Sequence, residues 1–165
     1  MLLRVKSETG CTAVCSGAIF STYQKNRVEK VCERLGLLSI APLWRRDQDP
    51  LLSEMIDSGF TIRIIKVASI GLGQQHLGKT ADELIGHFRE INKKFGFNVC
   101  GEGGEYESLV TDCPIFSHRL VLGGVKQVCH SPDDMAPVWY ETFESVQVVE
   151  KSGVKEVSLS ERAGA

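Results

Sequence analysis

The chain has 165 residues, which is enough for one domain with a sizeable buried core. Its net charge of −2 argues against a general nucleic-acid binder and against a protein that adheres to membrane surfaces. No apolar run is long enough to cross a bilayer, and the apolar part of the N-terminal stretch is too short for a signal peptide.

The six cysteines could in principle form disulfides, but the chain has no secretion signal, no Cys-x-x-Cys pair and no zinc-like spacing. We therefore expect buried free thiols in a reducing compartment, and a cytoplasmic protein. The cysteines are Cys11, Cys15, Cys32, Cys100, Cys113 and Cys129.

Apolar strand-like runs alternate with segments of helical spacing over the first hundred residues. This alternation is typical of a parallel α/β sheet. The predicted elements are a strand at 11–19, a helix at 22–35 capped by Gly36, a strand at 38–43, a helix from Pro50 to Gly59, a strand at 61–70 that is apolar apart from Arg63 and Lys66, a helix at 80–95 and a short strand at 98–100.

Beyond Pro114 the apolar residues recur with period two instead. This pattern predicts antiparallel strands at 119–128 and 138–150. The tail from Lys151 is polar, and we expect it to be frayed.

The stretch from Gly73 to Thr80 matches the phosphate-binding pattern G-x-x-x-x-G-K-[ST]. On that interpretation backbone N–H groups and Lys79 would surround phosphates, while Thr80 would bind magnesium. A nucleotide hydrolase of this type also needs a second strand that ends in a magnesium-binding aspartate, and Asp112 is a weak candidate. The alternative is a glycine turn followed by a helix that Thr80 caps.

A second candidate site lies between the first predicted strand and its helix, where open α/β sheets form their ligand crevice. Ser21, Tyr23, Gln24 and Arg27 could all reach this crevice. An ordinary helix cap with a solvated face would also explain these side chains.

The third candidate is the signature segment, residues 101–107, with the sequence GEGGEYE. Three glutamates flanking glycines and a tyrosine could hold a metal, an ammonium ion or an organic cation, or could form an acidic surface turn. The turn would explain the charge but not the glycines, which serve where a backbone needs unusual dihedrals or a close approach.

The segment GEGGEYESLVTDCPIF, which begins at Gly101, closely resembles the signature of the diphthine–ammonia ligase (diphthamide synthase) family. Other segments match the family in the same order: SGAIFSTYQKNRVEKVCERLGL, LWRRDQDPLLSEMI, IIKVASIGL, HLGKT and HSPDDMAP. The resemblance runs from about Ala13 to Pro137.

The resemblance implies an α/β fold: a partial parallel sheet of an adenine-nucleotide alpha-hydrolase-like (HUP) domain of the ATP pyrophosphatase type, with a smaller C-terminal α+β substrate-binding region. It divides the chain into a nucleotide part at 1–70, a substrate region at 71–150 and a polar tail at 151–165. Nucleotide binding is then assigned to Ser21, Tyr23, Gln24 and Arg27. Substrate binding is assigned to Gly78, Lys79, Gly101, Glu102, Gly103, Gly104, Glu105, Tyr106 and Glu107.

The implied activity is amidation of diphthine on elongation factor 2, the last step of diphthamide formation. ATP, with Mg²⁺, would adenylate the carboxylate, and ammonia would displace AMP. Diphthine carries a trimethylammonium group, so the glutamates of the signature segment could receive either this cation or ammonium. No nucleic acid, membrane or resident metal is implied.

Two departures from the family pattern bear on activity. The Ser-Gly-Gly-Lys-Asp-Ser loop that grips pyrophosphate in the family does not occur in these 165 residues, and Thr22 stands where the family has aspartate. We therefore expect a truncated chain that is inactive by itself. The alternatives are a non-catalytic binding remnant of the family and a nucleotide hydrolase built on Gly73–Thr80.

Overall fold

The computed structural model describes residues 1–151 and divides them into two compact units. The first unit comprises Met1–Glu54 and Ile85–Glu105, and the second comprises Met55–Leu84 and the chain from Tyr106 on. No helix among the described residues combines the length and the apolar character needed to cross a membrane.

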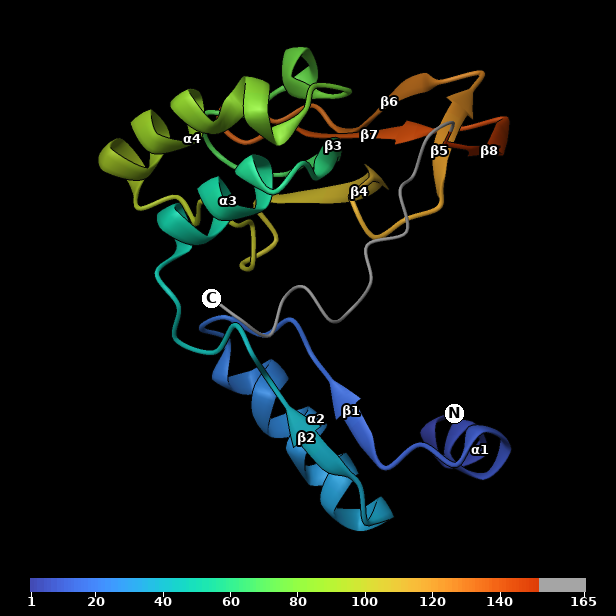
Figure 1. Cartoon of the computed structure of the whole chain (residues 1–165). Coiled ribbons are helices and arrows are strands. Elements are labelled where there is room, and N and C mark those ends of the chain that lie inside the picture. Colours follow the sequence, from blue (N-terminus) through green and yellow to red (C-terminus); the bar gives the residue numbers. More distant parts are fainter. Residues whose placement is uncertain (152–165) are drawn as a thin grey trace. The chain divides into compact units, whose positions relative to one another are not determined.

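The first unit is built around a small parallel sheet. β1 (Ala13–Cys15) pairs in parallel with β2 (Leu38–Ile40), and α2 (Thr22–Leu35) connects the two strands and packs against β2 (Figure 1). The predicted helix at 22–35 is confirmed, and Gly36 caps it at φ 61°, where a residue without a side chain is favoured. A further helix, α1 (Leu2–Thr9), precedes β1 and was not predicted.

Two longer helices contribute residues to both units. α3 (Gln48–Asp57) and α4 (Ala81–Phe95) confirm the predicted helices, with starts within a few residues of the expected ones. In the first unit Phe88 of α4 is fully buried, and its ring lies 5.3 Å from that of Phe97. Other buried apolar side chains of this unit include Cys32, Leu51, Leu52, Ile91 and Val99.

The second unit contains two antiparallel sheets. The first has the order β4-β3-β7-β6, formed by β3 (Thr61–Val67), β4 (Tyr106–Asp112), β6 (Lys126–Ser131) and β7 (Val138–Thr142). The second pairs β5 (His118–Gly123) with β8 (Ser145–Glu150). A short 3-10 helix, η1 (Gln74–His76), lies between β3 and α4 in the sequence.

The predicted α/β fold class is confirmed, with a small parallel sheet followed by antiparallel sheets. However, the expected parallel partner β3 pairs antiparallel with β4 and β7. Alternation along the chain gives the order of the elements, but it does not tell which distant strands form hydrogen bonds with the two edges of β3. Here both of these partner strands come from the C-terminal half of the chain.

The C-terminal pattern predicted two long strands, and each of them is divided. The segment at 119–128 turns at Gly124, whose φ of 64° favours glycine, and the segment at 138–150 is broken between Thr142 and Ser145. The antiparallel pairing itself is confirmed, because β5 pairs with β8 and β6 with β7.

The predicted strand at 98–100 is wrong. The side-chain oxygen of Asn98 accepts hydrogen bonds from the backbone N–H groups of Cys100 and Glu102, which closes a turn instead. Of the predicted frayed tail, only Lys151 lies within the described residues. Its ammonium donates to Asp112 and to the carbonyl of Cys113.

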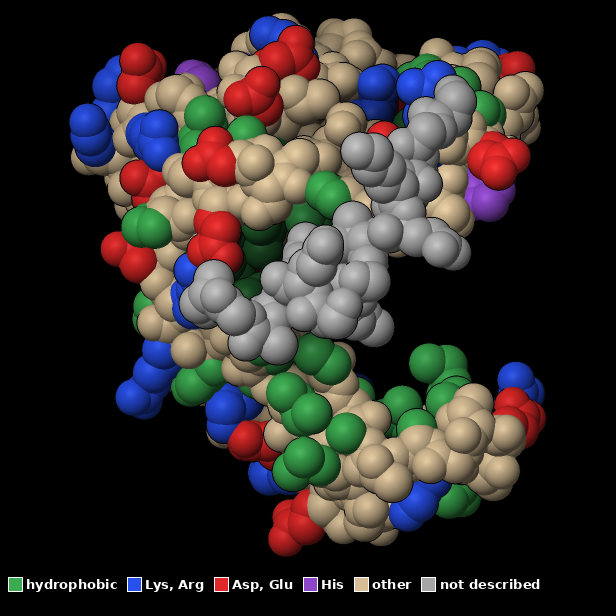
Figure 2. All heavy atoms as spheres, viewed as in Figure 1, with side chains coloured by type: hydrophobic (Ala, Val, Ile, Leu, Met, Phe, Trp, Pro, Cys, Tyr) green, Lys and Arg blue, Asp and Glu red, His purple; other side chains and the backbone are tan. Residues whose placement is uncertain are grey.

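The β1–β2 pair exposes apolar side chains. Figure 2 shows hydrophobic side chains over this pair, and on β2 they include Leu38 and Ile40, which are 63% and 41% exposed. These two positions alternate with Ser39, as side chains on one face of a strand do.

We expect Phe88→Ala to lower the free energy of unfolding by about 3–5 kcal/mol, because the change leaves a cavity in a fully buried site. Phe95→Ala in the same helix is the matched control. Phe95 is 57% exposed, and its loss should cost less than about 1 kcal/mol. Urea unfolding of both variants checks this, and equal losses would contradict it.

Candidate functional site

The predicted crevice between β1 and α2 contains a pocket of about 470 Å³, within the range of small-molecule sites. Three of the four residues assigned to nucleotide binding line it, and the fourth does not. Ser21 instead caps α2, because its hydroxyl accepts from the backbone N–H of Gln24 at 3.3 Å. The lining residues are Ser16, Gly17, Ala18, Tyr23, Gln24, Arg27 and Val28.

Two side chains that line this first pocket have hydrogen-bonding groups that the described part of the protein does not use. The hydroxyl oxygen of Ser16 is buried without a hydrogen-bond partner among the described residues, and such groups normally have one. The guanidinium of Arg27 donates to the Tyr23 hydroxyl at 2.7 Å and keeps further donors for an anionic group. A nucleotide, with its ribose hydroxyls and phosphates, fits this donor set.

The signature segment is ordered by its own carboxylates. The carboxylate of Glu102 accepts hydrogen bonds from the backbone N–H groups of Ile19 and Phe20 at 2.7 Å each, and of Ser21 at 3.2 Å. These three donors lie in the turn between β1 and α2. Glu102 and Ser21, which were assigned to different sites, are therefore brought together.

The side chain of Glu105 also points back toward the backbone just before the signature segment. One of its carboxylate oxygens accepts from the backbone N–H of Asn98 at 3.3 Å, while the other is buried without a partner in the described part of the chain. A side chain at Gly103 would place its Cβ 2.7 Å from this carboxylate, so the present position of the Glu105 side chain depends on glycine there. Gly101 and Gly104 have φ angles of 70° and 89°, which also favour glycine.

The last two signature residues belong to the second unit. Tyr106 is buried in β4, and Glu107 pairs with Lys66 of β3 at 2.6 Å on an exposed face. Glu107 also lines a pocket of about 330 Å³ within this unit. Its other lining residues are Ile65, Lys66, His130, Val138, Tyr140 and Glu141.

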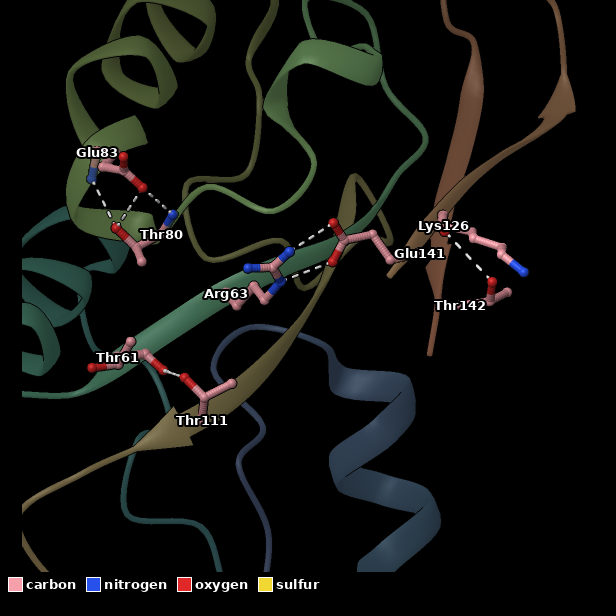
Figure 3. Close-up of polar contacts among 8 residues, drawn as sticks. All are labelled: Thr61, Arg63, Thr80, Glu83, Thr111, Lys126, Glu141 and Thr142. Carbon is pink, nitrogen blue, oxygen red and sulfur yellow. Dashed lines mark hydrogen bonds and ion pairs between the residues drawn. The ribbon is translucent and has the colours of Figure 1, made fainter. Parts of the chain in front are cut away.

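Gly78 and Lys79 lie beside β3 in the second unit. Gly78 donates to the carbonyl of Ile64 and has a φ of 78°. A Cβ there would lie 2.8 Å from the Arg63 guanidinium and 2.9 Å from the Glu141 carboxylate, which form the bidentate ion pair of Figure 3. Lys79 is exposed and has no recorded side-chain partner among the described residues.

The structure contradicts the phosphate-loop interpretation of Gly73–Thr80. Such a loop must leave its backbone N–H groups free for phosphate, but here most of them bond within the protein. His76 donates to Gly73, Leu77 to Gln74, Gly78 to Ile64, and Thr80 to the Glu83 carboxylate.

Thr80 instead caps α4, because its hydroxyl accepts from the N–H of Glu83 (Figure 3). The reciprocal hydrogen bond from the Thr80 N–H lowers the pKa of the Glu83 carboxyl.

Sequence reasoning missed an acidic pocket of about 310 Å³ in the first unit. Asp47 and Asp49 line it, and Asp49 pairs with Arg89 at 2.7 Å. The matching family segment LWRRDQDP was the available signal. The other lining residues are Phe20, Gln48, Asn92, Gly96, Phe97, Asn98 and Val99.

The Arg63–Glu141 pair was also missed, although Arg63 stands out as a charge in an apolar strand. Its partner comes from a strand 78 residues away, which local patterns do not reveal. Among the described residues, no group of three or more histidine, cysteine or acidic side chains is arranged to hold a metal ion.

Comparison with known proteins matches both parts of the chain to one family. Residues 2–39 match the diphthamide synthase N-terminal domain and residues 47–140 the diphthamide synthase C-terminal domain. The chain is 45% identical over 156 residues to the diphthine–ammonia ligase of Danio rerio, covering 94% of this chain and 61% of that protein.

The diphthine–ammonia ligase of Homo sapiens is 45% identical over 152 residues, which are 92% of this chain and 57% of the relative. The Schizosaccharomyces pombe protein of the same name is 51% identical over 123 residues, which are 74% of this chain and 20% of the relative. The chain thus spans 57–61% of these two vertebrate relatives and a smaller part of the yeast protein.

We expect Cys100 to react slowly with iodoacetamide at pH 8. Burial, together with the negative charges of Glu102, Asp49 and Asp47, raises the pKa of its thiol to about 11, and the thiolate is the reactive form. The rate should be on the order of a hundredfold below that of a free thiol and should keep rising up to pH 10. Site-resolved mass spectrometry measures it.

The exposed Cys15 and Cys129 are internal references for this experiment. In urea the three thiols should react alike, because both the burial and the local charges are lost. A Cys100 that reacts as fast as the references in the folded protein would contradict the expected effect.

Proposed function

Because the chain belongs to the diphthamide synthase family, we propose that it forms part of a diphthine–ammonia ligase that amidates diphthine on elongation factor 2. The match to both family domains in order carries the proposal. All seven matching relatives bear this enzyme name.

We assign the nucleotide to the first pocket. Arg27 would neutralise phosphate charge, the unpaired Ser16 hydroxyl would bind a ligand oxygen, and Tyr23 and Gln24 would complete the wall. Bound ATP, with Mg²⁺, would supply the leaving group that activates the diphthine carboxylate. The protein residues bind and orient the reactants rather than form covalent bonds with them.

Negative charge suits both cations of the proposed reaction, the trimethylammonium of diphthine and ammonium. Glu102 is occupied by three backbone N–H groups, so we assign cation recognition to carboxylates with remaining capacity. In the first unit these are Asp47 and Glu105. In the second unit Glu107 lines a pocket with Tyr140.

The substrate roles of Gly78 and Lys79 stay predictions, as do the division of the chain at residue 70 and the cytoplasmic location. The need for a pyrophosphate loop also stays a prediction. Close packing against Arg63 and Glu141 explains why position 78 is a glycine. The side chain of Lys79 is exposed and could contact an anionic group of the substrate.

The direct test is an amidation assay with diphthine-bearing elongation factor 2, ATP and ammonium. The 165-residue chain is assayed alone and joined to the upstream segment of the zebrafish relative. We expect diphthamide and AMP to form in equal amounts in the joined form. Absence of conversion by both forms, with a vertebrate relative active in parallel, would overturn the proposed function.

A binding experiment tests the nucleotide pocket separately. Arg27→Ala should weaken ATP binding about tenfold to a hundredfold, because one charge-assisted contact is lost. Arg34→Ala removes the same side chain from the last turn of α2, outside the pocket, and should leave affinity within about twofold. Calorimetric titration of ATP into each chain measures this, and equal losses would place the nucleotide elsewhere.

A further inference from the structure

The Glu102 anchor, meaning its three hydrogen bonds to the N–H groups of Ile19, Phe20 and Ser21, joins segments 81–83 residues apart in the sequence. Hydrogen bonds to an ionised carboxylate are stronger than those between neutral groups. Three successive N–H groups can converge on one acceptor only where the backbone bends around it, so the carboxylate holds the turn in one shape.

The anchored turn forms a wall of both pockets in the first unit. Ala18, immediately before the anchor, lines the first pocket beside Arg27. Phe20, which donates to Glu102, lines the acidic pocket beside Asp49. A displacement of this short turn therefore changes the walls of two cavities with different chemistry.

The anchor also reaches the rest of the signature segment. The Glu102 N–H donates to the side chain of Asn98, and the Asn98 N–H donates to Glu105. Asn98 itself lines the acidic pocket. Hydrogen bonds therefore run without a break from the turn after β1, through Glu102 and Asn98, to Glu105.

We propose that Glu102 is a positioning residue that makes the turn at 18–21 and the signature segment move as one unit, so that nucleotide in the first pocket sets the shape of the acidic pocket. This inference assigns Glu102 a different role from the cation binding that the family resemblance implies. The effect of nucleotide on the acidic pocket rests on the proposed function. The joint movement of the turn at 18–21 and the signature segment does not depend on it.

Amide hydrogen exchange of the full chain without ligand tests the joint opening. In the unmodified chain the amides of Ile19, Phe20 and Glu102 should open with the same free energy. Glu102→Gln should speed exchange at Ile19 and Phe20 about tenfold or more, because a charged acceptor is lost. The matched control, Glu33→Gln, removes an exposed carboxylate of α2 in the same unit and lies outside the hydrogen bonds that link the turn to the signature segment.

Glu102→Asp provides the rescue, since it keeps the charge and shortens the side chain by one methylene. It should restore part of the protection that Glu102→Gln removes. Unchanged exchange at Ile19 and Phe20 in Glu102→Gln, or an equal rise in Glu33→Gln, would overturn the positioning role.

A second arm adds ATP at millimolar concentration. In the unmodified chain ATP should slow exchange at Cys100, Glu102 and Gly104, which lie outside the first pocket. In Glu102→Gln the ATP affinity should stay within about threefold while this distant response disappears. An equal response in both chains would overturn the coupling.

The two arms separate the proposals. If the unmodified chain does not bind ATP at all, the nucleotide assignment fails and with it the proposed coupling. The exchange measured without ligand still decides whether Glu102 holds the two segments together.

Discussion

One carboxylate held by three consecutive backbone N–H groups organises the first unit. Through Glu102, the turn that follows β1 and the segment that precedes β4 share a single hydrogen-bonded arrangement. This contact explains why so much negative charge lies on a glycine-rich backbone. The charge of Glu102 is compensated by amide dipoles, and the glycines allow the turns and close contacts of this segment.

Acidic side chains of the two units differ in how far they are paired with basic groups. In the second unit the side chain of Glu141 is 1% exposed and is fully paired with Arg63, whereas the Lys66–Glu107 pair lies in solvent and contributes little to stability. In the first unit, Asp47 has no recorded side-chain partner among the described residues, and its negative charge faces a pocket. Uncompensated negative charge in a pocket is suited to a cation.

Local features of the fold were predictable, and long-range ones were not. The helix at 22–35 and its Gly36 cap follow from apolar spacing and from the backbone freedom of glycine, both of which act within a few residues. The pairing of β3 with β7 joins strands that lie far apart in the sequence, which local patterns do not reveal. The turn at Asn98 is local but was missed as well, because its strand-like neighbours masked the turn signal of the asparagine. Asn98 shows this clearly, because a single side-chain oxygen outweighed the strand preference of its neighbours.

The candidate site was predictable to a similar degree. Tyr23, Gln24 and Arg27 line one pocket, since the start of a helix after a parallel strand places its side chains at the sheet edge. The assignment of Glu102 to a cation could not be checked from the sequence, because its amide partners carry no side-chain signal. Lys79 belongs to a phosphate-loop motif, but several backbone N–H groups of that motif form hydrogen bonds within the protein.

The packing at Gly78 has an evolutionary consequence. A methyl group at this position would meet both members of the Arg63–Glu141 pair, so the three residues form one steric and electrostatic set although they lie far apart in the chain. The backbone at Gly78 also has a φ of 78°, so a larger residue would be strained there even if the ion pair were lost. Glycine at position 78 should therefore persist among homologues even where residues 63 and 141 change.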